Sequence, residues 1–221
     1  MDLEFILSVL TIIGVDIVLG GDNAIVVALA CRNLPKELRN KAMVLGILLA
    51  IIIRMGLTVI AVHLLSIPFL LAIGGGLLTF IAFQLLLNSH DDPKIKGSTS
   101  LLAAIKIIIF ADCIMGFDNV IAVAGAAHGN TLLVIIGLLV SVPIILWGSK
   151  LILKAFDVYP QIIYVGAGIL AFTASKMIIH EPMLAPLFIH APTFKLVFQI
   201  SLIIGVLIGG WIIKSRQEIS V

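Results

Sequence analysis

Residues 15–24 read Val15-Asp16-Ile17-Val18-Leu19-Gly20-Gly21-Asp22-Asn23-Ala24. This stretch places two carboxylates, a carboxamide and a Gly-Gly pair inside an apolar run that extends from about residue 5 to residue 31. The pattern returns 96 residues later, within a second apolar run, so that Asp16, Gly20, Asp22 and Asn23 correspond to Asp112, Gly116, Asp118 and Asn119. We base the prediction of both the fold and the site on this duplicated polar motif.

The composition excludes an ordinary water-soluble domain. Of the 221 residues, 61% are hydrophobic and 12% are charged, whereas soluble domains have about 25% charged residues. A helix of roughly 20 apolar residues crosses the hydrocarbon layer of a membrane. Runs of this kind lie near residues 5–31, 42–65, 67–88, 101–127, 131–153, 160–179 and 196–214. We therefore predict an all-α, polytopic membrane protein with seven transmembrane helices.

The basic residues predict the orientation of the chain. Ten of the fourteen follow or end the first, third, fifth and seventh apolar runs: Arg32, Lys36, Arg39, Lys41, Lys94, Lys96, Lys150, Lys154, Lys214 and Arg216. The positive-inside rule then places the N-terminus outside and the C-terminus in the cytoplasm. We expect a multi-pass protein of the inner (plasma) membrane. The first run carries the polar motif, so we do not expect a cleaved signal peptide.

A second set of matches extends the internal repeat. Pro68, Gly74, Gly76, Leu78, Phe80 and Ala82 correspond, at an offset of 92, to Pro160, Gly166, Gly168, Leu170, Phe172 and Ala174. We predict one transmembrane domain over residues 1–221, with repeat one at 1–90, repeat two at 98–180 and an additional helix at 195–215. Three spans in each repeat make the copies inverted, which is typical of transporters. The paired glycines favour close helix packing.

The repeated polar residues need an explanation, because an acidic side chain at the centre of a membrane helix costs on the order of 2.5–3.5 kcal/mol. Such residues usually mark an ion pathway, a proton relay or a counter-ion. We predict a metal site near the membrane midplane formed by Asp16, Asp22, Asn23, Asp112, Asp118 and Asn119. The alternative is that Arg54, Lys106 and Lys176 neutralise these acids in structural ion pairs. That alternative is stronger for Asp16 and Asp112 than for the acids that precede an asparagine.

Carboxylate, carboxamide and main-chain oxygens suit Mg²⁺, Ca²⁺ or Mn²⁺ better than Zn²⁺ or Cu⁺. Met115 lies inside the second motif, where a thioether ligand would favour Mn²⁺ over Ca²⁺; the other interpretation is apolar filler. Buried carboxylates can exchange a metal ion for protons, which is compatible with proton-coupled antiport. Lys176 and Arg54 are candidates for balancing the charge of the site or gating it.

One long outer loop carries His180, Glu181 and His190 among several prolines. Imidazole and carboxylate groups in this position could capture or release a cation outside the membrane. A plain solvated loop is the simpler interpretation, and we expect it.

The doubled motif resembles that of the TerC family of bacterial integral membrane proteins, which is named for tellurium resistance and is similar to the broader lysine-exporter-like group. Each motif joins glycine, Asp and Asn, as in Gly21-Asp22-Asn23 and Gly116-Phe117-Asp118-Asn119, with a further Asp six residues before the Asp-Asn pair. The resemblance covers nearly the whole chain. It implies a seven-helix fold and, for several members, export of manganese, and it marks the six Asp and Asn residues named above as the cation site.

We therefore expect a divalent-cation transporter that exports Mn²⁺ from the cytoplasm. One alternative is a non-transporting membrane partner that assists metalation or assembly of exported proteins; another is a Ca²⁺ transporter. An intramembrane metal enzyme is disfavoured because no His or Cys is duplicated with the acids. We expect no catalytic residue, no prosthetic group and no nucleic-acid partner. The expected partners are the lipid bilayer and the cation, and a homo-oligomer stays open.

Overall fold

The structure is a computed structural model. It describes residues 10–11, 14, 21–64, 67–87, 100–126, 131–189 and 191–219. Within these helices, the side chains of some residues, including 117–126, lie outside the described set.

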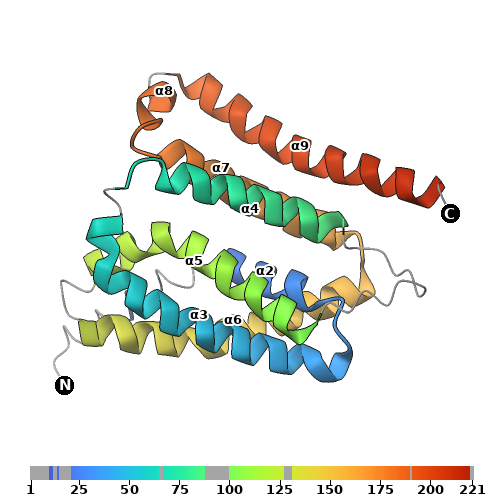
Figure 1. The fold of residues 1–221 in the computed structure, drawn as a ribbon, viewed down its shortest axis with the longest axis horizontal. Coiled ribbons are helices and arrows are strands. Elements are labelled where there is room, and N and C mark those ends of the chain that lie inside the picture. The colour runs from blue at the N-terminus through green and yellow to red at the C-terminus, as the bar shows by residue number, and fades with distance from the viewer. Residues whose placement is uncertain are drawn as a thin grey trace. The chain divides into compact units, whose positions relative to one another are not determined.

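The described residues form α-helices and no strands, so the predicted all-α class is confirmed for them. Figure 1 shows the helices and their labels. In chain order they are α2 (Gly21–Cys31), α3 (Lys36–Leu64), α4 (Leu70–Leu87), α5 (Leu101–Ala126), α6 (Thr131–Val158), α7 (Ile162–His180), α8 (Ala185–Ile189) and α9 (Pro192–Ile219). All except α8 overlap one of the seven predicted apolar runs.

Five of the described helices are long and apolar enough to cross a membrane. Their apolar segments are Lys36–Leu57, Leu70–Leu87, Ile135–Val158, Ile162–His180 and Pro192–Ile213, and α2 is a shorter apolar helix. A polytopic membrane protein fits this pattern. The count of seven transmembrane helices and the inverted repeat stay predictions.

The chain divides into two compact units. Unit 1 contains Met1–Ser66 and Thr99–Lys154, and unit 2 contains Ile67–Ser98 and Ala155–Val221. Each predicted repeat therefore gives its first two helices to unit 1, apart from the last turn of α6, and its third helix to unit 2. The predicted repeats are continuous in sequence, whereas each compact unit combines helices from both of them.

In unit 1, α3 and α5 pack side by side (Figure 1). Gly46 of α3 makes this possible, because a Cβ atom there would stand 2.7 Å from Cδ1 of Ile108 on α5. About two turns further along α3 and one turn further along α5, Arg54 of α3 reaches Asp112 of α5. Because both contacts advance in the same chain direction, α3 and α5 run parallel. Helix α2 contacts both of them.

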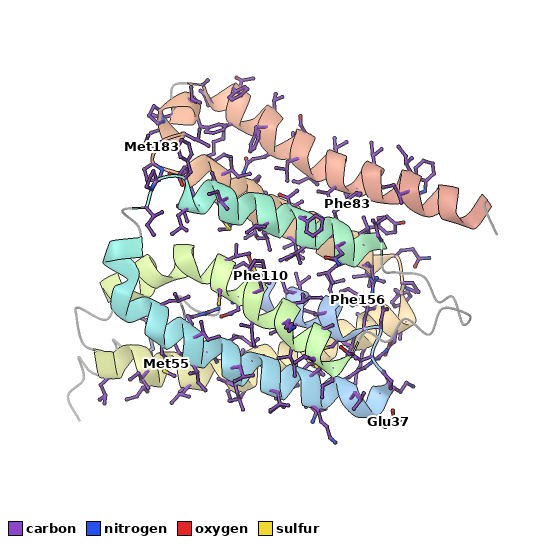
Figure 2. The ribbon with its side chains drawn as sticks, in the orientation of Figure 1. Glu37, Met55, Phe83, Phe110, Phe156 and Met183 are labelled. Atoms are coloured by element: carbon purple, nitrogen blue, oxygen red, sulfur yellow. The ribbon has the colours of Figure 1, made fainter. Side chains whose placement is uncertain are left out.

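In unit 2, α4 packs on α7, and both helices contact α9. A Cβ atom at Gly75 of α4 would stand 2.7 Å from the main-chain oxygen of Ala174 on α7, so the two helices approach closely, as the glycines predicted. Phe83 of α4 lies on the side of the helix that contacts α9, near Gly209 (Figure 2). The Phe188 ring of α8 stacks on Phe194 of α9, with 5.4 Å between ring centroids.

Large apolar side chains remain exposed on the outer faces of both units. Trp147 in unit 1 is 69% exposed, and Trp211 in unit 2 is 60% exposed. Figure 2 shows side chains projecting outward along α9, where Leu196, Ile204 and Ile208 are exposed too. Large exposed apolar side chains on helices long enough to cross a membrane suit contact with lipid chains.

Candidate functional site

An ion pair lies buried between α3 and α5 of unit 1. Nε of Arg54 donates a hydrogen bond to Oδ2 of Asp112 at 3.2 Å, and Nη2 of Arg54 donates a second bond to Oδ1. The Arg54 side chain is 3% exposed and the Asp112 side chain 12%. A two-point guanidinium–carboxylate pair is both directional and strong in a low-dielectric interior. Two charges that would each be costly in an apolar bundle therefore neutralise each other.

One face of α5 forms the surface that Arg54 contacts. Ile108, Asp112 and Gly116 are spaced four residues apart, so they share one face of the helix. A Cβ atom at Gly116 would stand 3.6 Å from Nε of Arg54, which means that the arginine side chain runs beside this glycine. Gly116 and Asp112 both belong to the second copy of the duplicated motif. The motif thus supplies the carboxylate and the open surface next to it.

Asn23 contributes a second buried polar group from α2. Its side chain is 4% exposed, and within the described part of the chain neither Oδ1 nor Nδ2 has a hydrogen-bond partner. Leaving a carboxamide unpaired in an apolar interior costs about 1–3 kcal/mol by mutational measures. Native proteins keep few such groups, and each one calls for an explanation. An unmade hydrogen bond in the duplicated motif points to a ligand.

These three side chains meet at one small cavity inside unit 1. The cavity offers about 20 Å³ of space for a water-sized sphere, and roughly 10–15 Å³ is enough for one water molecule. Its polar lining is Asn23, Arg54 and Asp112, and the remaining lining residues are Val26, Val27, Ile47, Ala50, Ile51, Ile108 and Ile145. The volume suits one ion that has shed its hydration shell. The available ligands are carboxylate and carboxamide oxygens, which are hard donors.

The other predicted site residues are less closely gathered. Asp22 is half-buried beside Asn23 on α2, and Met115 is buried on α5; neither is among the described residues that line the cavity. Asp118 and Asn119 belong to α5, but their side chains lie outside the described set, and Asp16 lies outside the described residues altogether. Among the residues that the structure describes, three or more His, Cys, Asp or Glu side chains do not cluster as a metal centre.

Lys176 belongs to unit 2, not to the unit that holds Arg54 and Asp112. It lies on α7, and its Nζ is 5.1 Å from the centre of the Phe172 ring. A cation over an aromatic face gains a modest electrostatic attraction. The proposed gating role of Lys176 therefore stays a prediction, while the structure gives the lysine a contact on its own helix.

Glu181 was expected in a solvated loop, and that expectation is wrong. The residue is 1% exposed. Its carboxylate accepts hydrogen bonds from the main-chain N–H groups of Phe69 and Leu71, each at 3.0 Å, and of Ala72 at 3.3 Å. The first turn of α4 has free N–H groups and no Ser, Thr, Asp or Asn at positions 67–69 to cap it. That missing local cap was the signal for a distant one.

Phe69 adds a local reason for this arrangement. Its φ angle is 62°, a left-handed conformation that non-glycine residues rarely adopt. Helix α4 begins at the next residue, Leu70. Glu181 anchors the strained residue through its N–H group, and its negative charge also complements the positive end of the helix dipole.

The described features define a multi-pass helical membrane protein with a small cavity, lined in part by polar side chains, in one of its two units. The chain matches the family described as integral membrane protein TerC over residues 1–218. It therefore belongs to the TerC family, as the doubled motif indicated.

Several curated membrane proteins resemble the chain. It is 50% identical to the uncharacterized membrane protein YjbE of Bacillus subtilis, over 84% of this chain and 85% of YjbE. It is 22% identical to the uncharacterized membrane protein YkoY of the same organism, over 98% of this chain and 74% of YkoY. The inner membrane protein YoaE of Escherichia coli is 26% identical over 74% of this chain, a match that spans 35% of YoaE. No solved structure matches the chain.

Proposed function

We propose that this protein transports a divalent metal cation, with Mn²⁺ as the substrate and export from the cytoplasm as the direction. The observation that carries the proposal is the unit 1 cavity, where the unpartnered carboxamide of Asn23 and the carboxylate of Asp112 line one space. Ionisable groups buried in membrane helices commonly mark ion pathways, proton relays or counter-ions. We also propose the inner (plasma) membrane as its location, with the N-terminus outside.

The donor chemistry supports a hard divalent ion. Asn23 offers a carbonyl oxygen and Asp112 offers two carboxylate oxygens, and Mg²⁺, Ca²⁺ and Mn²⁺ all accept such ligands. Preference for Mn²⁺ rests on the family resemblance and on Met115, which is buried on the helix that carries Asp112. Ca²⁺ is the second candidate substrate.

The charge of the cavity indicates that further ligands are needed. Arg54 and Asp112 sum to zero, so by themselves they do not attract a cation. Asp22 on α2 and Asp118 on α5 are the nearest motif residues in sequence, and we propose that they add the missing negative charge. Exchange of the ion for protons on these carboxylates would couple export to the proton gradient.

Flux through purified protein in liposomes tests the proposal. Mn²⁺ uptake is followed with a trapped fluorescent indicator, with and without a pH gradient, for the parent, Asp112→Asn, Asn23→Ala and Asp118→Asn. We expect parent flux to exceed that of protein-free liposomes and all three variants to lose at least nine-tenths of it. Ca²⁺ and Mg²⁺ in the same assay rank the substrates.

Glu37→Gln is the matched control, since it also removes one carboxylate. Glu37 lies on α3 with Arg54 but is exposed in the first turn of the helix, and Figure 2 shows it at the helix end. Its flux should equal that of the parent. Full flux in the Asp112 and Asn23 variants would contradict the proposed site. No flux in any form, with Mn²⁺ still bound, would favour a non-transporting partner that passes metal to exported proteins.

A further inference from the structure

We propose that Arg54 is a tethered substitute for the substrate cation: it occupies the Asp112 carboxylate while no metal ion is bound and must release it before a metal ion binds. This inference rests on the proposed function and adds a competitor within the same site. In this role Arg54 is a positioning residue that sets the affinity for the metal ion and the rate of its release. A purely structural ion pair would only hold α3 against α5.

The geometry puts the competitor and the ligand in the same place. Both oxygens of Asp112 accept hydrogen bonds from the one guanidinium group. The same carboxylate and the same guanidinium line the cavity together with Asn23. A metal ion in a cavity of about 20 Å³ therefore meets a carboxylate whose two oxygens are already engaged. Each oxygen keeps a second lone pair, but the positive guanidinium group next to both oxygens opposes a second cation there, so we expect binding to require that Arg54 release at least one of them.

Electrostatics make the competition mutual. A divalent ion at Asp112 would be repelled by a guanidinium group that stayed in place, and this repulsion is weakly screened in a buried site. The arginine side chain has several rotatable bonds, and it runs beside Gly116, where a Cβ atom would stand 3.6 Å from its Nε. The return of Arg54 to Asp112 then helps to expel the ion.

Pairing with Arg54 also stabilises the ion-free state of a transporter whose site lies in an apolar bundle. Without an ion, a bare carboxylate at Asp112 would be costly to bury. With Arg54 bound to it, the ion-free protein stays neutral at this point and stable. The same arrangement keeps the affinity for the ion moderate, so that release is not prevented.

Equilibrium Mn²⁺ binding to purified, detergent-solubilised protein tests this inference directly. Arg54→Gln removes the competing charge and should bind Mn²⁺ about tenfold more tightly than the parent, which corresponds to about 1.4 kcal/mol. Arg54→Lys keeps a cation but offers a single point of attachment in place of the planar fork, so its affinity should lie between the two. In liposomes, Arg54→Gln should show a lower maximal flux, because release of the ion becomes slower.

Lys106→Gln is the matched control for loss of one positive charge. Lys106 is exposed on α5, the helix of Asp112, and its variant should bind Mn²⁺ with parent affinity. Circular dichroism and gel filtration establish that each variant is folded. If Arg54→Gln does not fold, the comparison of Arg54→Lys with the parent still decides the question.

The direction of the affinity change separates the outcomes. A pair that only braces two helices predicts weaker or unchanged Mn²⁺ binding when Arg54 is replaced, and either result overturns the inference while leaving the cation site in place. If the parent itself binds no Mn²⁺, the proposed function fails and the inference fails with it. Tighter binding in both Arg54 variants supports the tethered competitor.

Discussion

The two units of the molecule each bury a carboxylate, but they satisfy it in different ways. In unit 2, three main-chain N–H groups at the start of α4 bind Glu181. In unit 1, a side chain from another helix, Arg54, binds Asp112 in the middle of α5. The unit 2 carboxylate is held by groups that cannot move without unfolding the helix end. The unit 1 carboxylate is held by a group that can move by side-chain rotation alone.

This difference helps to distinguish a buried carboxylate with a structural role from one with a functional role. Glu181 repairs a helix terminus that its own sequence leaves uncapped, so a structural role explains it fully. The cavity beside Asp112 and the unpartnered carboxamide of Asn23 have no structural explanation of this kind. Burial and charge alone would have ranked Glu181, at 1% exposed, above Asp112. Whether the carboxylate is bound by main-chain or by side-chain groups is therefore a better indication of its role than burial and charge.

The largest expected effect comes from removing the carboxylate of unit 1. Asp112→Leu takes away the acceptor of two hydrogen bonds from buried Arg54. We expect a loss of about 3–5 kcal/mol in the free energy of unfolding. Thermal unfolding in detergent, followed by circular dichroism, measures it.

The double variant Asp112→Leu with Arg54→Met controls for the charge left behind. Apolar replacement of a buried ion pair is often neutral for stability, so the double variant should unfold close to the parent temperature while transporting no Mn²⁺. If the single variant is as stable as the parent, the ion pair does not stabilise unit 1 and the comparison with Glu181 loses its meaning.

Removing the carboxylate of unit 2 should have a somewhat smaller effect on stability. Glu181→Ala leaves three N–H groups at the start of α4 without their acceptor, and we expect a loss of about 3 kcal/mol. Glu181→Gln retains one acceptor oxygen and should lose roughly half as much. The same thermal unfolding measurement applies.

Mn²⁺ binding shows whether Glu181 is structural only. Both Glu181 variants should bind Mn²⁺ with parent affinity under conditions where they are folded. A large drop in affinity in Glu181→Gln, with the fold intact, would mean that the carboxylate belongs to an ion pathway, and the distinction between the two units would be wrong.

Much of the fold was predictable because membrane helices are encoded by long apolar runs. Seven of the eight helices in the described residues overlap the predicted runs, and the glycines of α4 predicted the close approach seen at Gly75. Which helices group into a unit was not predictable from these runs. That grouping depends on contacts between segments far apart in sequence, such as Gly46 with Ile108, and hydrophobic periodicity says nothing about them.

The site was predictable in its residue types and less so in its partners. The energetic cost of a charge in a membrane helix identified Asp112 and Arg54 individually. For the acids, the two interpretations were a metal site and structural ion pairs. The pairing itself needed the parallel packing of α3 on α5, which the sequence does not state. Glu181 was missed because a carboxylate next to prolines looks like part of a loop. Only the uncapped start of α4, about 110 residues earlier, pointed to its role.

The smallest expected effect on stability concerns Asn23 and has the opposite sign. Its carboxamide is buried without a hydrogen-bond partner, so Asn23→Leu, which keeps a similar volume, should raise the free energy of unfolding by about 1 kcal/mol. The same change should abolish Mn²⁺ binding, because it removes a ligand oxygen. Stability gained at the expense of function is typical of active sites. A loss of stability in Asn23→Leu would show instead that the carboxamide stabilises the fold, and its burial would then have a structural explanation, as that of Glu181 has.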